Sequence, residues 1–593
     1  MNFSVRRKRS STTSRVLLGL SLAGLLAGCT GASVGSTSLP PSSSSTAVPL
    51  SSYSPERVRH EGGTLVIGDW ESPTNLAPMF NQELPAAEID AALYAGLTRL
   101  DAQLHWAPDL AERVPTLENG DVSWNRAAHT MDVSYRLRAG LRWSDGQPIT
   151  ARDVAFTWRA LVDPHAQGYL DTTGYQAISR IDIRDDLHLT LHFERVYPEY
   201  LTLFPAVLPE HRLRDVAFSQ LPTDAFWVRP DVVSGPYKVS EVVPDEHITL
   251  VRNLTWSQGR GDARPHLDTI IYKVYPEAGQ LIDAARKGEV ALALEIPDGE
   301  LSGLGNLNKV SLMHRASLAY EQVTFNQADP NPLTGQPPVW KGDPVLLKAL
   351  RIGVDREALD RTLLGGQAEL ADSPIPSALT QYRSPDPAPA FDSRQAAQLL
   401  DSDGWVVGPD GVRVKAGRRL SFSLTTALGD PLRLAVRDRL IADWRRIGVQ
   451  VLPSDAHPSQ LFAGYAEGGL LEHGSFEAGL WTWSIGPDPD GVYALEHSSE
   501  IPTDRNQGQG SNFGRFASQN IDQSLERGRG SLLAGQRVQA YSAFERAYND
   551  LGAELPLYQR VLSVLASPHL HNVLPNPAPD TTFWNVADWW VDP

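Results

Sequence analysis

The feature that most constrains the fold is a single cysteine, Cys29, in a chain of 593 residues. One thiol excludes a disulfide framework and any zinc site built from several thiolates. A hydrophobic core must therefore hold the fold together, and 41% of the residues are hydrophobic, which excludes disorder over most of the chain. Because a domain takes roughly 100–200 residues, the length predicts several domains.

The sequence around Cys29 is typical of a bacterial lipoprotein signal. Residues 6–15 are rich in Lys and Arg, and residues 16–27 form an apolar run that is too short to cross a bilayer of about 30 Å as a helix. The run ends in Leu26-Ala27-Gly28-Cys29, which resembles a lipobox, the motif in which the cysteine is alkylated by diacylglycerol. The alternative is a plain secretory signal in which Cys29 is incidental.

This segment predicts where the protein works. We expect residues 1–28 to be a signal peptide and residues 29–61, which are rich in Ser, Thr and Pro, to be a flexible tether. No later run approaches the 18 or so apolar residues of a membrane-spanning helix. The expected location is extracytoplasmic, lipid-anchored to the cell membrane, in the periplasm if an outer membrane is present.

Charge and motif content argue against several function classes. The 53 Lys and Arg against 70 Asp and Glu give a net charge of −17, which disfavours nucleic acid as a partner. The Gly-x-Ser-x-Gly match at residues 31–35 lies in the Ser-rich segment after Cys29 rather than at a strand-to-helix turn, and no His-Glu-x-x-His motif or Walker loop occurs, so no catalytic site is predicted. The pair His569 and His571 makes a metal site conceivable, but chance pairing is the stronger interpretation. A lipid-anchored hydrolase stays open as an alternative.

Hydrophobic periodicity predicts interleaved strands and helices, which is typical of a mixed α/β protein. Strands are expected at 64–67, 131–137, 181–183, 189–193, 237–239, 248–251, 270–275, 290–296, 449–452 and 555–558. Helices are expected at 86–97, 150–161, 277–287, 344–364, 394–400, 432–447 and 535–551. Thr150 and Asp153 have the spacing of a capping box at the start of one helix.

Several distinctive motifs are spaced from residue 62 to the C-terminus. The longest is YRLRAGLRWSDGQPITARDV at residues 135–154. The others are GGTLVI at 62–67, LYAGL at 93–97, LPEH at 208–211, GPYKV at 235–239, SNF at 511–513 and LPLY at 555–558. Together they resemble family 5 of the extracytoplasmic solute-binding proteins, the peptide and oligopeptide receptors of ABC importers, and the stretch 135–154 is the most specific match. Its Trp143 and Asp145 are expected to determine the fold rather than to contact ligand.

The resemblance implies a two-lobed, periplasmic-binding-protein-like fold (type II, cluster C-like) with an extra domain inserted in the first lobe. In this sequence, lobe I corresponds to residues 62–94, 209–310 and 560–593, the inserted domain to 95–208, and lobe II to 311–559. The implied function is capture of peptides or oligopeptides in the interlobe cleft and delivery to an ABC permease. We expect a monomer without cofactor, metal or catalysis.

Two alternatives to a peptide receptor of an ABC importer remain open from the sequence alone. The first keeps the importer role but changes the ligand to a metal chelate, a saccharide or another solute. The second is a chaperone-like lipoprotein that binds unfolded segments.

The segment 479–490 is the expected cleft strand. Trp481 and Trp483 are two residues apart, so a strand places both indoles on one face, where they form either a groove wall or part of the core. In peptide-binding relatives, an aspartate three residues after a tryptophan pairs with the ligand's α-ammonium. Matching that tryptophan to Trp483 puts Gly486 at the aspartate position. The ammonium anchor is therefore displaced to Asp488 or Asp490, or is missing, and a solvated turn is the alternative role for these aspartates.

Two further regions are expected to line the cleft. Ser72 follows the first strand, at the kind of strand end where α/β sheets usually bind ligands. Asn512 and Phe513 follow a glycine-rich loop that allows close approach to a ligand.

Overall fold

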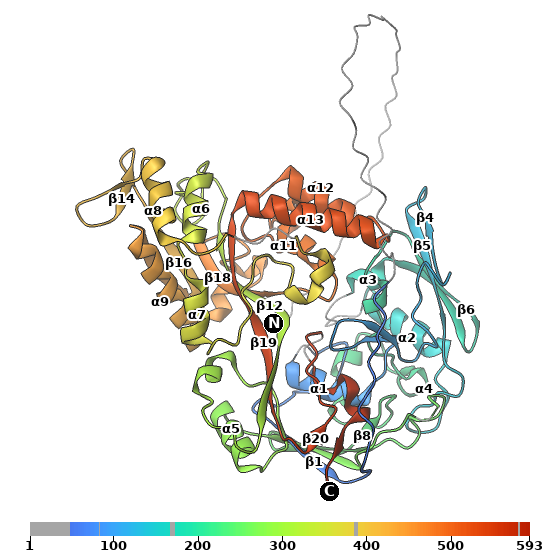
Figure 1. The fold of residues 1–593 in the computed structure, drawn as a ribbon. Helices are drawn as coiled ribbons and strands as arrows, with labels where there is room; N and C mark the ends of the chain where they lie inside the picture. Colours follow the sequence, from blue (N-terminus) through green and yellow to red (C-terminus); the bar gives the residue numbers. More distant parts are fainter. Residues whose placement is uncertain (1–47, 82, 166–171, 262, 385–388, 579–580) are drawn as a thin grey trace, which may run out of the picture.

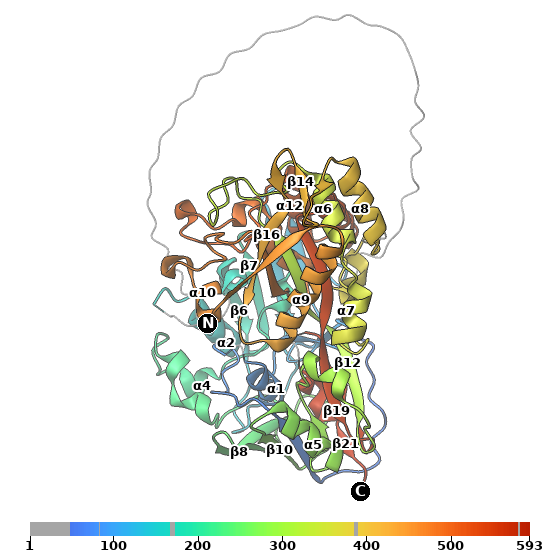
Figure 2. The ribbon, with the colours of Figure 1, turned by 90° about the vertical axis from the view of Figure 1, so that its left-hand side faces the viewer.

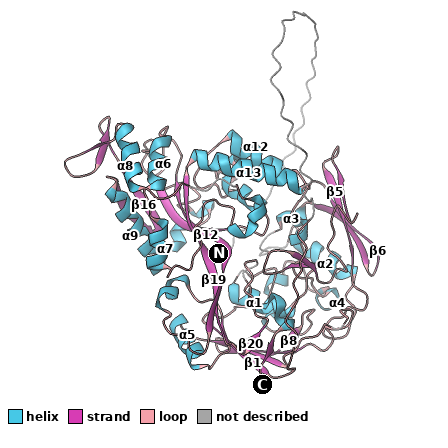
Figure 3. Cartoon of the chain, in the orientation of Figure 1, coloured by secondary structure: helices cyan, strands magenta, loops and turns pink. Residues whose placement is uncertain are grey.

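The computed structural model describes residues 48–593 except 82, 166–171, 262, 385–388 and 579–580. One mixed ten-stranded sheet runs through the molecule (Figures 1 and 3). Its strands, in spatial order, are β17 (Gln450–Ala456), β16 (Ser421–Ala427), β18 (Ala478–Ser484), β12 (Ser311–Phe325), β19 (Glu554–Ala566), β11 (Leu292–Ala293), β1 (Thr64–Asp69), β10 (Thr269–Val274), β9 (His247–Arg252) and β8 (Tyr237–Val243). The predicted α/β class is confirmed.

A separate four-stranded sheet lies to the right in Figure 1. Its spatial order is β4 (Val122–Asn125), β5 (Thr130–Arg136), β7 (His188–Phe193) and β6 (Ile178–Asp185). Short strands form three smaller groups: β2 (Thr98–Leu100) with β3 (Trp106–Pro108); β13 (Val406–Val407), β14 (Arg413–Lys415) and β15 (Arg418–Arg419); and β20 (Leu570–His571) with β21 (Trp590–Val591).

Helices are interspersed with these strands along the chain. They are α1 (Leu84–Leu93), α2 (Ala151–Val162), α3 (Thr173–Gln176), α4 (Glu210–Leu213), α5 (Ala278–Lys287), α6 (Pro344–Ile352), α7 (Arg356–Leu363), α8 (Ser393–Ser402), α9 (Pro431–Arg446), α10 (Pro458–Leu461), α11 (Tyr493–Glu496), α12 (Gln519–Arg529) and α13 (Ala534–Leu551). No described helix is both long enough and apolar enough to cross a membrane.

The long strands β12 and β19 join the two halves of the molecule. They lie near the centre of Figure 1 and right of the centre in Figure 2, between the part that contains α5 and the part that contains α6 to α9. Their antiparallel pairing is irregular between Ala316 and Tyr320. The first half of β12 pairs with β19 near β11, and the second half also pairs with β18. Each half of the molecule has its own core, and the cluster around Phe325, Trp340 and Trp444 belongs to the second. We propose that the domain boundaries follow those predicted from the sequence.

Two motif glycines allow close backbone packing around the end of α1. A Cβ on Gly96 would lie 2.5 Å from the carbonyl oxygen of Phe204, and one on Gly235 would lie 2.3 Å from that of Ala92. Real Cβ atoms do not approach backbone so closely. These glycines in the LYAGL and GPYKV motifs are therefore required by packing.

The residues 143–153 build a turn and a capped helix, as the sequence predicts. Trp143 is fully buried, Asp145 accepts from the backbone N–H of Gln147 at 3.0 Å, and Thr150 and Asp153 form a capping box at the start of α2. The capping box satisfies backbone donors that a helix start leaves free.

Several element boundaries differ from the prediction. Helix α1 ends at Leu93 rather than at residue 97, because residues 95–97 instead hydrogen-bond to residues 204–207. The predicted helical segment 344–364 contains two helices, since Asp355 caps a new one at Arg356. Only Leu292–Ala293 of the predicted strand 290–296 is regular.

Part of the predicted tether is held against the body. Ser51 donates its backbone N–H to the carbonyl of Trp106 at 2.9 Å and its hydroxyl to Asp101 at 2.6 Å. Glu56 donates its backbone N–H to Asn572 at 2.7 Å. The predicted signal peptide and Cys29 lie outside the described residues.

Candidate ligand-binding cleft

Two cavities lie side by side between the segments predicted to form the lobes and the inserted domain. The first has a volume of about 530 Å³ and the second about 560 Å³. Trp106, Leu201, Thr202 and Pro487 line both, so we treat the two cavities together as the cleft. Clefts of this size, at the junction of structural units, are typical small-molecule sites.

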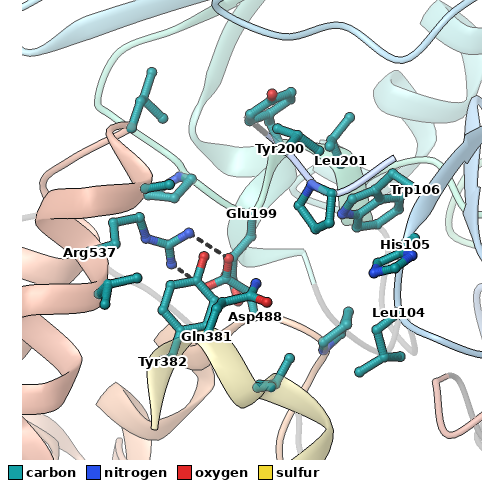
Figure 4. Close-up of a pocket in the computed structure, with 18 of the residues that line it drawn as sticks. Leu104, His105, Trp106, Glu199, Tyr200, Leu201, Gln381, Tyr382, Asp488 and Arg537 are labelled. Atoms are coloured by element: carbon teal, nitrogen blue, oxygen red, sulfur yellow. Dashed lines mark hydrogen bonds and ion pairs between the residues drawn. The ribbon is translucent and has the colours of Figure 1, made fainter. Parts of the chain in front are cut away.

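The first cavity brings together segments that are far apart in sequence (Figure 4). Residues 103–106 and 198–202 form one part of its wall, while residues 378–382, Pro487 and Asp488, and the start of α13 form another. Val48 and Pro49, from the predicted tether, also line it.

A buried ion pair dominates the first cavity. Arg537 Nη1 donates to Asp488 Oδ2 at 2.8 Å, Arg537 Nη2 donates to Asp488 Oδ1, and the Arg537 side chain is 7% exposed. The guanidinium also lies 5.5 Å from the ring centres of Tyr382 and Tyr541. The arginine therefore neutralises the carboxylate that the sequence singles out as a possible ammonium anchor.

Glu199 adds a further carboxyl group to this cavity. Burial, together with the neighbouring carboxylates of Asp488 and Asp490, raises the pKa of Glu199 to about 8. This shift favours the protonated form of Glu199, which can donate a hydrogen bond.

Asp490, which the sequence predicts to contact ligand, does not line either cavity. It is 6% exposed, accepts from Arg529 Nη2 at 2.9 Å and accepts from the Tyr541 hydroxyl at 3.2 Å. Burial raises the pKa of Asp490, and the Arg529 charge opposes that rise. These contacts connect the loop after β18 to α12 and α13.

The two tryptophans of β18 have different environments. Trp481 is 2% exposed and packs with Leu461, Leu471 and Phe476, so the core alternative is correct for it. Trp483 is half-buried, and its ring centre lies 5.3 Å from that of Phe513. Trp481, Trp483 and Phe513 form one aromatic cluster, but none of them lines either cavity.

Asn512 is completely buried and lines neither cavity. Its Nδ2 donates to the carbonyls of Phe516 at 2.9 Å and His497 at 3.2 Å, while its Oδ1 has no hydrogen-bond partner among the described residues. Ser72 is half-buried and also lines neither cavity.

The histidine pair shares a surface carboxylate. His569 Nδ1 and His571 Nε2 each lie 3.2 Å from an oxygen of Asp592, and the His571 ring stacks on Trp590. Within the described residues, no group of three or more His, Cys, Asp or Glu side chains is arranged to hold a metal ion.

The second cavity is mostly apolar and aromatic. Tyr94, Trp106, Trp256 and Trp584 line it, together with Asp90 and Arg99. The cleft therefore offers a charged, hydrogen-bonding side and an apolar side, which suits a solute that has both polar and apolar groups. The sequence reasoning missed Asp90, Glu199 and Arg537.

Comparisons with known proteins agree with this architecture. The family model "Bacterial extracellular solute-binding proteins, family 5 Middle" matches residues 107–501. The oligopeptide-binding protein AppA of Bacillus subtilis is 24% identical over 544 residues, covering 90% of this chain and 92% of AppA.

Solved structures show the same fold. AppA from Bacillus subtilis in complex with a nonapeptide gives a TM-score of 0.67 at 22% identity and covers 90% of this chain and 100% of AppA. NikZ from Campylobacter jejuni in complex with Ni(L-His) also gives 0.67 at 22% identity, covering 89% and 99%. The predicted two-lobed binding-protein fold is confirmed.

Proposed function

The chain belongs to the bacterial extracellular solute-binding proteins of family 5, and from this premise we propose that it captures a peptide or peptide-like solute and delivers it to an ABC permease without catalysing a reaction. The observation that carries the proposal is the cleft, whose two joined cavities have a polar and an apolar side. An extended peptide presents both kinds of group, because main-chain amides alternate with side chains.

Mass spectrometry of solutes that co-purify with the protein tests the ligand class directly. We expect short peptides, and titration with the identified peptide should lower the radius of gyration as the lobes close. Recovery of a metal chelate or saccharide instead would keep the importer role and reject the peptide ligand. Uptake that is unchanged after deletion of the gene, in a strain without a paralogue, would reject the importer role itself.

We also propose that Cys29 carries the lipid that holds the protein at the membrane. Cys29→Ala should release the protein into the soluble fraction without lowering its melting temperature. The acyl chains supply about 0.8 kcal/mol of membrane affinity per buried methylene. Membrane fractionation of both forms measures this, and Cys29→Ala protein that remains in the membrane fraction would contradict the lipid anchor.

Gly486 offers a test of the proposed ammonium site. Gly486 is exposed, and a Cβ built on it meets no atom within 4 Å, so Gly486→Asp adds a carboxylate without a clash. Asp488 is already paired with Arg537. A carboxylate at position 486 has no such partner, so it is more available than Asp488 to attract a ligand ammonium. The affinity of a free peptide relative to its N-acetylated form should rise by about 1 kcal/mol in the variant.

Titration calorimetry with one peptide in both forms measures this ratio. Gly486→Asn is the matched control, because it adds a similar volume without charge. An unchanged ratio in Gly486→Asp would show that the N-terminal ammonium does not lie at this position.

A further inference from the structure

The second cavity contains a buried carboxylate that lacks a counter-charge. Asp90, on α1, lines this cavity and is 6% exposed. Its Oδ1 has no hydrogen-bond partner among the described residues. Burial raises the pKa of Asp90 well above its usual value, with no neighbouring cation to oppose the rise. A cation placed beside such a carboxyl group favours its ionised form and lowers its pKa again.

Of the other charged residues of this cavity, Asp109 is ion-paired, and Arg99 donates to a carbonyl while its Nε has no hydrogen-bond partner among the described residues. Asp109 pairs with Arg260 at 2.6 Å, and Arg99 Nη1 donates to the carbonyl of Trp584 at 3.4 Å. Asp90 is therefore the carboxylate that a ligand cation entering this cavity would meet without displacing an existing ion pair.

The walls around Asp90 also suit a cation. Tyr94, Trp106, Trp256 and Trp584 line the same cavity, and aromatic faces attract cations through their quadrupole. Alanine and proline side chains from α1 and its surroundings, including Ala87, complete an apolar lining. An ammonium group on an apolar body fits both features.

We propose that Asp90 binds a protonated amine of the captured solute and that the second cavity is the subsite for this amine and its apolar stem. This inference rests on the proposed function, in that the cleft is the place where solute binds. In a peptide, the amine is either a lysine side chain or the α-ammonium. Both present the same chemistry to Asp90, and the measurements below separate them.

The test compares alanyl-lysyl-alanine with alanyl-norleucyl-alanine, which has the same four-carbon side-chain stem without the ammonium group. Titration calorimetry of Asp90→Asn should show a loss of at least about tenfold in affinity for the lysine peptide, since the buried ammonium loses its partner. A loss confined to the lysine peptide assigns the subsite to the side chain, and an equal loss for both peptides assigns it to the α-ammonium. Unchanged affinity for both peptides overturns the inference.

Two controls keep the result interpretable. Asp186→Asn removes an exposed carboxylate that lines neither cavity and should leave both affinities unchanged. Asp90→Asn should not lower the melting temperature, because it removes an unpaired buried acid. A lowered melting temperature with retained lysine-peptide affinity would show that Asp90 is structural and overturn the inference.

A non-peptide probe separates this inference from the proposed function. The unmodified protein should bind 2-phenylethylamine and not the uncharged 2-phenylethanol, and Asp90→Asn should lose that preference. If no peptide binds but the amine preference is present, the peptide receptor proposal fails and the amine subsite stands. Equal binding of amine and alcohol by the unmodified protein overturns the subsite.

Discussion

Replacing Arg537 with leucine should lower the free energy of unfolding by about 3–5 kcal/mol, the usual effect of removing one partner of a buried ion pair. The substitution leaves the Asp488 carboxylate, which is 14% exposed, without its cation. It also removes a positive charge that lowers the pKa of Glu199 and of Asp490. The carboxyl groups of Asp488, Glu199 and Asp490 would then lie close together in one poorly hydrated region.

Urea denaturation measures this change. Arg546→Leu is the matched control, because Arg546 lies on the same helix α13 and is exposed. This control substitution should change the free energy of unfolding by less than about 0.5 kcal/mol. The double variant Asp488→Leu/Arg537→Leu should recover part of the loss, since no unpaired charge remains at that pair. An Arg537→Leu protein as stable as the unmodified one would show that the ion pair contributes little.

Local sequence patterns predict most of the elements but not the central strand β12. The segment Ser311–Phe325 contains Glu321 and Gln322, which do not suggest a buried strand. Both are nevertheless fully enclosed, because Arg433 pairs with Glu321 at 2.6 Å and Glu554 accepts from Gln322 at 2.9 Å. Since these partners come from distant parts of the chain, no window of sequence around β12 reveals them.

The candidate site was predictable only in part. The resemblance to the family pattern points to residues 486–490. Of these, Pro487 and Asp488 line the cleft wall in the structure. Its arginine partner, Arg537, comes from a helix whose sequence gives no sign of this contact. The aromatic pair of β18 was the more obvious feature, yet Trp481 belongs to the core.

The sequence contains one indication that Asp90 is unusual, because it interrupts an apolar helix face. Ala86, Asp90 and Leu93 are spaced four and three residues apart, so a helix places them on one face, and all three are buried. An acidic residue on an otherwise apolar helix face is a departure from amphipathic patterning. Such departures mark functional or strained sites more often than regular positions do.

Glu88, also on α1, should make stability depend on pH. Its carboxylate is 1% exposed and accepts from the Thr582 backbone N–H at 2.8 Å, the Phe583 N–H at 2.9 Å and the Thr581 hydroxyl at 2.8 Å. These bonds attach α1 to the C-terminal segment that borders the second cavity. Burial raises the pKa of Glu88 from 4.5 to about 7, although the backbone donors oppose the rise.

The direction of the pH effect follows from proton binding in the two states. Between pH 4.5 and about 7 the folded protein keeps the Glu88 proton that the unfolded chain releases, so the stability contributed by this group falls as pH rises through that window. At 1.36 kcal/mol per pKa unit, the loss above pH 7 is about 3 kcal/mol. The Glu88→Gln variant stays uncharged and retains an acceptor oxygen for the backbone donors, so it should not lose this stability as the pH rises.

Urea denaturation of both proteins at pH 4, 6 and 8 isolates this contribution, because other titrating groups are common to both and cancel in the difference. The free energy of unfolding of Glu88→Gln minus that of the unmodified protein should increase by about 3 kcal/mol from pH 4 to pH 8. The increase should begin above pH 4.5, where the unfolded carboxyl group ionises, and level off above pH 7. A difference that is constant across this range would mean that the pKa of Glu88 is the same in the folded and the unfolded protein, with its hydrogen bonds compensating fully for burial.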